Sequence, residues 1–336
     1  MKKIKQFGPG LILCLAIAVP SWFLGKEFNI VGGPVFGILF GILAGMFLKK
    51  PVFEKGIAFT SKKILQYSII LLGFEMNLFS ILRIGSQSLF IMAFTLGSAF
   101  LAAYFVGRGL KVPGKLATLI GVGTSICGGS AIAATAPVIQ AEDREVAQSI
   151  STIFLFNIVA VFIFPTLGRL MGLSDAGFGM WAGTAINDTS SVVAAGVSWS
   201  ETSGTGTALE MATIVKLTRT LMIVPVTLAL AIYTSKKNAA DGKNNFHFAK
   251  VFPWFVIGFL AAAVLSTFTG MPAALAHGLS TAGKFMIVMA MAAIGLNTNL
   301  KSMLKNGYKP ILLGSICWAA VALASLAAQW GTGSFL

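Results

Sequence analysis

Two short polar stretches interrupt apolar segments of this sequence, at residues 121–130 and 183–191. Glycine lets a backbone unwind and approach a ligand, and the free N–H groups at a helix start bind anions. We therefore predict a break in the helix at 121–130, against the alternative that its small residues serve close helix packing. The candidate binding residues are Thr124, Ser125, Cys127, Gly128, Gly129, Ser130, Thr184, Asn187, Thr189 and Ser190.

Asp188 lies near the middle of the second apolar segment, where an ionised carboxylate is costly. Insertion of such a group at the centre of a bilayer costs at least about 2.5 kcal/mol, so it faces a cavity or a partner. The carboxylate could ligate a sodium ion, because hard cations prefer oxygen ligands, or it could carry a proton. The competing interpretation is a structural ion pair.

Lys216 and Arg219 lie three residues apart in the next apolar segment, which places them on one helical face. Together with Asp188 they leave a net positive charge near the middle of the membrane. This favours an anionic substrate, because the guanidinium fork suits oxyanions. The alternative is that Asp188 neutralises one cation while the other extends to the interface. Which of the two is structural stays open at this point.

The elements that position these residues are apolar segments of about 20 residues, long enough to cross a hydrocarbon core of about 30 Å. The chain is 56% apolar and 11% charged, against about 25% charged in soluble domains. Backbone inside lipid must satisfy its own hydrogen bonds, so the predicted fold is all-α and polytopic. We predict eleven spans in one transmembrane domain, 1–336: 10–24, 30–48, 62–80, 86–106, 115–139, 146–168, 178–198, 208–233, 251–268, 281–298 and 310–330.

The distribution of basic residues supports this map. With a cytoplasmic N-terminus, 19 of the 25 Lys and Arg residues fall in predicted inner loops and three in outer loops. Such a bias is typical of membrane proteins with positive residues inside. The compact chain with its short loops predicts a multi-pass protein of a bacterial inner membrane. The net charge of +14 then needs no nucleic-acid partner, since anionic lipid attracts the basic residues at the cytoplasmic edge of the membrane.

Other chemistries have little support. Cys14, Cys127 and Cys317 lie in apolar segments and show neither a disulfide framework nor metal-ligand spacing. An intramembrane hydrolase would need a catalytic pair in the membrane, where Asp188 stands alone. We therefore expect no enzyme and no cofactor, with sodium as a candidate coupling ion. Wide apolar faces permit a homodimer.

Two internal similarities suggest repeats. Residues 73–78 resemble 295–300 at an offset of 222, and the topology above runs these copies in opposite directions, as transporters with inverted repeats require. Residues 123–126 resemble 183–186 at an offset of 60, and Pro165 pairs with Pro225. In the same topology these copies run in one direction. We therefore favour the offset of 222.

Four motifs carry a family resemblance: 123–139 (GTSICGGSAIAATAPVI), 181–196 (WAGTAINDTSSVVAAG), 215–219 (VKLTR) and 295–300 (GLNTNL). They closely resemble a bacterial family labelled sulfate exporters, in order and over nearly the whole chain. That family is similar to the sodium/proton antiporter and bile-acid symporter superfamily.

The resemblance implies a panel-and-core fold with inverted five-helix repeats, at 30–170 and 177–330 after a first helix at 10–24. It also implies two broken helices that cross at the midplane. The fifth span would be one, and the tenth would be the other if helices two to six pair with seven to eleven. The family pattern is expected to carry a histidine before the aspartate, where this chain has Asn187. A proton relay through that histidine is therefore in doubt here.

These observations predict a secondary transporter of a small anion, such as sulfate, a sulfonate or a carboxylate. Lys216 and Arg219 would hold the anion beside the two polar stretches. Asp188, Asn297 and Asn299 would bind the coupling ion. The alternative for each asparagine is that it caps a helix. The alternatives are a sodium or proton antiporter and, from another class, the intramembrane hydrolase.

Overall fold

The computed structural model describes residues 2–28, 33–48, 51–237, 254–298 and 307–333. Within these ranges every regular element is a helix, which confirms the all-α prediction. Six helices are long and apolar enough to cross a membrane, and shorter apolar helices accompany them. Large apolar side chains are exposed on the outside of the bundle, for example Phe23, Phe105 and Leu323. Exposed apolar side chains of this kind suit a lipid environment.

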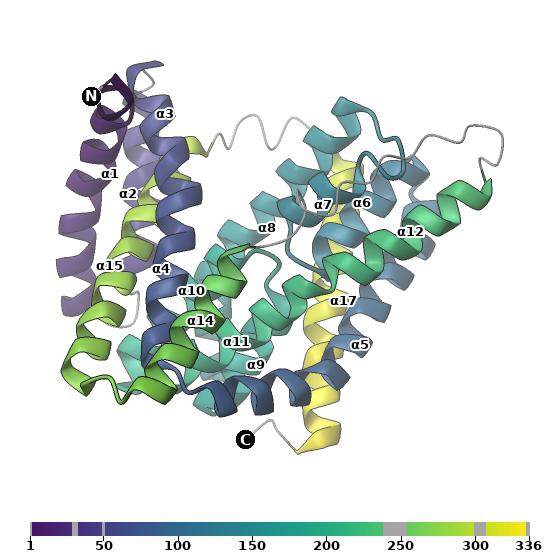
Figure 1. Ribbon diagram of the computed structural model, residues 1–336. Coiled ribbons are helices and arrows are strands. Elements are labelled where there is room, and N and C mark those ends of the chain that lie inside the picture. The colour runs from purple at the N-terminus through teal and green to yellow at the C-terminus, as the bar shows by residue number, and fades with distance from the viewer. Residues whose placement is uncertain (1, 29–32, 49–50, 238–253, 299–306, 334–336) are drawn as a thin grey trace.

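The helices form two groups that lie side by side (Figure 1). The first group comprises α1 (Lys2–Glu27), α2 (Gly33–Phe47), α3 (Pro51–Phe59), η1 (Thr60–Ile64), α4 (Leu65–Leu72), η2 (Gly73–Glu75), α14 (Trp254–Thr269) and α15 (Ala273–Asn297). The second comprises α5 (Leu78–Gly109), α6 (Gly114–Ser125), α7 (Gly129–Thr135), α8 (Asp143–Leu170), α9 (Asp175–Ala185), α10 (Thr189–Ser203), α11 (Thr207–Leu221), α12 (Ile223–Lys237) and α17 (Tyr308–Thr332).

Helices α6 and α7 form a hairpin, which we call hairpin 1 (residues 114–141). The Lys115 ammonium at the start of α6 donates to the backbone carbonyl of Gln140, after α7, at 2.6 Å. α6 has 12 residues, so it is about 18 Å long and reaches only partway through a hydrocarbon core. The predicted crossing span 115–139 is therefore wrong, because the chain returns to the face from which it enters.

Helices α9 and α10 form hairpin 2 (residues 175–203) in the same way. The indole N–H of Trp199, near the end of α10, donates to the carboxylate of Asp175, at the start of α9, at 2.7 Å. The rings of Phe178 and Trp199 stack with their centroids 4.0 Å apart. The predicted crossing span 178–198 is also wrong, since its two ends lie at one face.

The two hairpins enter the bundle from opposite faces, and α8 shows this along its length. Ile153 packs against α6 of hairpin 1, and Gly168 packs against Phe178 of hairpin 2. Between them, the side-chain carbonyl of Asn157 accepts the backbone N–H of Asp188 at the tip of hairpin 2. Hairpin 1 opens toward the face where α1 begins, which we call the N-terminal face (Figure 1). Hairpin 2 opens toward the other, which we call the opposite face.

In this topology Arg144, at the start of α8, lies at the N-terminal face, and Arg169, at its end, lies at the opposite face. The eleven-span map assigns each of them to the other side. The two changes compensate, so the bias of basic residues is unaltered.

The two units related by an offset of 60 now run in opposite directions, contrary to the sequence-based expectation, because each hairpin replaces a crossing. α15 is a continuous helix, so a break in the tenth span is wrong. Shared ancestry of either pair stays a prediction.

Cysteine labelling distinguishes the hairpin topology from eleven crossing spans. We expect Lys111→Cys and Arg144→Cys to react with a membrane-impermeant thiol reagent from one face. We expect Leu170→Cys and Ser203→Cys to react from the other. The three native cysteines are buried and give a low background. Labelling within either pair from opposite faces would contradict the hairpins.

Close packing of α2 on α15 depends on Gly41. A methyl group there would lie 2.4 Å from the carbonyl oxygen of Ala292 and 3.0 Å from the Cα of Gly295. We expect Gly41→Ala to lower the melting temperature of the purified protein, at a cost of about 1–3 kcal/mol from overpacking. Gly97 on α5 has open space around it, so Gly97→Ala is the control and should be neutral or stabilising. Equal melting temperatures for both variants would rule out this packing.

Candidate functional site

The tips of the two hairpins meet halfway along α8 and form the candidate site. In hairpin 1, α6 ends at Ser125 and α7 begins at Gly129. Gly128 between them has a φ of +69°, a conformation that L side chains rarely adopt. In hairpin 2, α9 ends at Ala185 and α10 begins after extended backbone at Ile186 and Asp188. Both breaks fall within the predicted polar stretches.

Arg219 on α11 joins the two tips through its guanidinium. Nε donates to the carbonyl of Ser125 at 2.6 Å, and a terminal nitrogen donates to the carbonyl of Thr124. The other terminal nitrogen donates to the carbonyls of Thr184 and, at 3.4 Å, Ile186. The side chain has no exposed surface. One buried cation thus holds the ends of α6 and α9 together.

Lys216 lies one turn earlier on α11 and makes the same kind of connection. Its ammonium donates to the carbonyl of Ile126 at 2.6 Å and to that of Ile186 at 3.1 Å. Carbonyls in the last turn of a helix lack a helical partner, and the helix dipole is negative there. Lys216 and Arg219 therefore both cap half-helices. Most of their N–H donors are hydrogen-bonded to backbone carbonyls, so few remain to bind an anion directly. The geometry therefore does not favour the expectation that these two side chains hold the anion.

Asp188 caps the start of α10 and is partly exposed. Its carboxylate accepts the backbone N–H of Ser190 at 2.9 Å and also the Ser190 hydroxyl. Among the described contacts, no ion pair joins Asp188 to Lys216 or Arg219. The structural ion pair considered from the sequence is therefore not formed. The three charges still lie around the same tips and sum to a net positive charge.

Several predicted hydroxyls point back into their own helices. Thr124 donates to the carbonyl of Ile120 at 2.8 Å, and Ser125 donates to that of Val122 at 3.1 Å. Thr184 donates to the carbonyl of Met180 and also bonds the hydroxyl of Ser325 on α17. These groups stabilise the hairpins. The other predicted residues at the tips are Cys127, which is buried, Gly129, which is partly exposed, Thr189, which is buried, and Ser130, which is exposed.

Two buried amides at the tips lack partners for their polar atoms among the described residues. Asn187 is 1% exposed, and neither its side-chain oxygen nor its nitrogen is hydrogen-bonded. Asn157 is 3% exposed, and its amide nitrogen has no acceptor. An unpaired buried polar group costs about 1–3 kcal/mol, so it calls for a partner such as water or a ligand. The sequence prediction missed Asn157, although an amide amid the apolar residues of 146–168 is the signal for it.

The structure does not bring the predicted coupling asparagines to this site. Asn297 is the exposed last residue of α15, at the N-terminal face. Asn299 lies outside the described residues. Of the predicted coupling residues, Asp188 alone is placed at the tips by the described structure.

Comparisons with known proteins agree on one family. A family model described as conserved hypothetical protein 698 matches residues 9–314. A UPF0324 membrane protein of Streptococcus pyogenes serotype M18 is 52% identical over 330 residues, which cover 97% of each chain. One of Fusobacterium nucleatum is 48% identical over 97% of this chain and 98% of its own length. One of Streptococcus mutans is 51% identical over 95% of this chain and 96% of its own.

Proposed function

We propose that this chain, which belongs to the UPF0324 family of multi-pass membrane proteins, is a secondary transporter of a small anion. The observation that carries the proposal is the meeting of two opposed hairpin tips around the unpartnered amides of Asn157 and Asn187. Irregular backbone at membrane depth is tolerated where it is buried in protein or lines a cavity. Tips that enter from opposite faces suit a site that opens to each face in turn.

The charges around the tips favour an anion such as sulfate, a sulfonate or a small carboxylate. Lys216 and Arg219 outnumber the one carboxylate, Asp188, and they are fully buried. Charge in a medium of low dielectric constant acts more strongly than in water. In this proposal the two cations supply the field, whereas the amide groups of Asn157 and Asn187 supply hydrogen bonds to the substrate.

Asp188 is the proposed contact for a coupling cation at the tips. In this proposal the N-terminal face is cytoplasmic, which the excess of basic residues predicted for that side supports. The partly exposed Asp188 carboxylate also favours a second candidate, a sodium or proton antiporter without an anionic substrate. The two functions differ in the solute that exchanges across the membrane.

Counterflow in proteoliposomes tests the proposal. Vesicles loaded with unlabelled sulfate, methanesulfonate or acetate are diluted into the same labelled anion, and empty vesicles serve as the control. The proposal predicts transient accumulation of label for one class of anion. Sodium/proton exchange in the absence of any anion counterflow would instead support the antiporter.

A further inference from the structure

A cavity of about 580 Å³ lies at the opposite face, between the two helix groups. Hairpin 2 and α11 line one side of it, and η2 and α15 line the other. The volume falls within the range of small-ligand sites, although this cavity is distinct from the hairpin tips. Its titratable residues are Glu75, Glu201, Glu210, His277 and Lys284.

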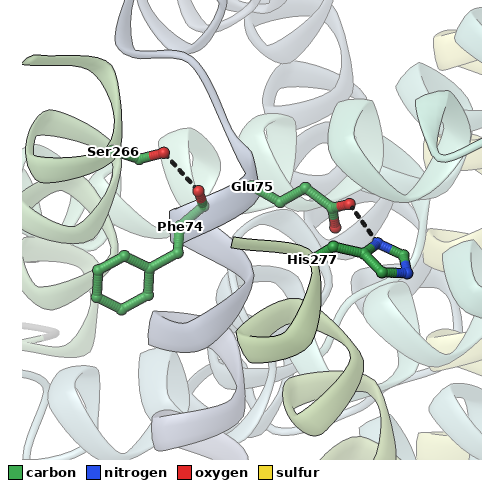
Figure 2. Close-up of polar contacts among 4 residues, drawn as sticks. All are labelled: Phe74, Glu75, Ser266 and His277. Atoms are coloured by element: carbon green, nitrogen blue, oxygen red, sulfur yellow. Dashed lines mark hydrogen bonds and ion pairs between the residues drawn. The ribbon is translucent and has the colours of Figure 1, made fainter. Parts of the chain in front are cut away.

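Acidic groups outnumber basic ones around this cavity. Figure 2 shows Glu75 of η2 paired with the imidazole of His277 on α15, at 3.1 Å. The side chains of Glu210 and Lys284 make no hydrogen bond or ion pair with another described residue. The hydroxyl of Ser280 is buried beside the Glu75 carboxylate. Three carboxylates share this cavity, and the ion pair found among its described residues involves Glu75 alone of the three.

Glu201 connects the two helix groups across this cavity. Its carboxylate, on α10 of hairpin 2, accepts the backbone N–H of Gly33 at 3.2 Å. Gly33 is the first residue of α2, where N–H groups have no helical partner and the dipole is positive. A negative charge on Glu201 therefore strengthens the connection between hairpin 2 and α2. Loss of that charge weakens it, because hydrogen bonds to ionised groups are stronger.

Glu201 lies in the last turn of α10, next to the opposite face. Burial raises the pKa of its carboxyl from 4.5 to about 7, while the Gly33 N–H, Lys284 and Lys26 act in the opposite direction. The other titratable groups around the cavity are Glu75, Glu210 and His277. The carboxyl of Glu201 thus changes charge near neutral pH, in a cavity that leads to one face.

We infer that Glu201 is the binding site for a coupling proton taken up from the opposite face. Its protonation weakens the hydrogen bond to the Gly33 N–H but removes the larger cost of a buried charge. The proton adds to a carboxylate oxygen and removes one negative charge, with no other bond made or broken. This inference rests on the proposed transport function and assigns its coupling ion to Glu201 in place of Asp188. It also separates the two roles, since the substrate binds at the tips and the proton binds one hairpin length away.

The first arm of the test measures melting temperature against pH for the purified full-length protein and Glu201→Gln. The folded protein holds this proton to a higher pH than the unfolded chain, so its stability falls as pH rises from about 4.5 through about 7. We expect Glu201→Gln to match the wild type at pH 4, below the unfolded pKa, and to melt at a higher temperature at pH 8. Glu54→Gln, an exposed carboxylate on α3, should follow the wild type at both. Identical pH profiles for wild type and Glu201→Gln would overturn the assignment.

The second arm compares exchange with net uptake in proteoliposomes, with labelled sulfate as the probe. We expect Glu201→Gln to retain counterflow but to lose uptake driven by a pH gradient, whereas Glu54→Gln retains both. Uptake driven by pH in Glu201→Gln, or by sodium alone in the wild type, would overturn the inference. Absence of counterflow in the wild type contradicts the proposed function instead, and the melting profiles then still decide the proton site.

Discussion

Replacing Arg219 with alanine is expected to prevent stable folding of the second helix group. The variant leaves the carbonyls of Thr124, Ser125 and Thr184 buried without a donor. Each unsatisfied buried group costs about 1–3 kcal/mol, so the sum approaches the stability of a typical domain. The two tips would also lose the cation that offsets the negative ends of α6 and α9. Among the described contacts, the Lys216 ammonium reaches the carbonyls of Ile126 and Ile186 and no others.

Fluorescence-detected size-exclusion chromatography of the tagged protein measures this effect. We expect Arg219→Ala to give little monodisperse protein, and Arg219→Lys to give an intermediate yield because one ammonium cannot serve both tips. Arg108→Ala is the matched control. Arg108 is exposed and bonds only the Tyr104 hydroxyl among the described contacts, so its loss should cost little. A wild-type melting temperature for Arg219→Ala would show that the tips are held by other means.

Replacing Asn187 with leucine is expected to abolish anion transport while preserving the fold. The amide has no hydrogen-bond partner in the described structure, so its removal breaks no internal contact. An apolar group of similar size in a buried site can be neutral or stabilising. In the proposal this amide contacts the substrate, and its loss should lower counterflow by at least about tenfold, the equivalent of roughly 1.4 kcal/mol.

Asn77→Ala gives the reverse pattern and serves as the control. Asn77 caps α5, where its side chain accepts the N–H groups of Phe79 and Ser80. Loss of such a cap costs about 1 kcal/mol. We therefore expect Asn77→Ala to lower the melting temperature and leave counterflow intact. Normal counterflow in Asn187→Leu would remove this residue from the site.

The sequence was sufficient to predict the residues at the tips but not the path of the chain. Residues 115–139 and 178–198 each have the length and apolarity of a crossing helix. A hairpin of two half-helices uses the same number of residues, so hydropathy does not distinguish them. The similarity at an offset of 60 contained the missing information. Two copies are inverted when the chain crosses the membrane an odd number of times between them. With residues 115–139 and 178–198 folded as hairpins, α8 is the single crossing between the two copies.

The roles of side chains proved harder to predict than their positions. The sequence pointed to Lys216 and Arg219 because a charged side chain in the middle of an apolar span is energetically costly, and the structure places both at the tips. Their acceptors are backbone carbonyls, which every residue carries and which leave no signal in the sequence. The cavity at the opposite face was missed for another reason. Glu75, Glu201 and Glu210 are far apart along the chain, and only the packing of the two helix groups brings them together.

Thermal stability of the purified wild type and Asn187→Leu against a panel of anions tests the central claim most directly. Sulfate, methanesulfonate, acetate and chloride are compared as sodium and as potassium salts. A ligand that binds only the folded state raises the melting temperature by mass action. An anion site at the hairpin tips predicts that one class of anion stabilises the wild type and not Asn187→Leu. Stabilisation by sodium alone, or equal stabilisation of both proteins by the same anion, would contradict it.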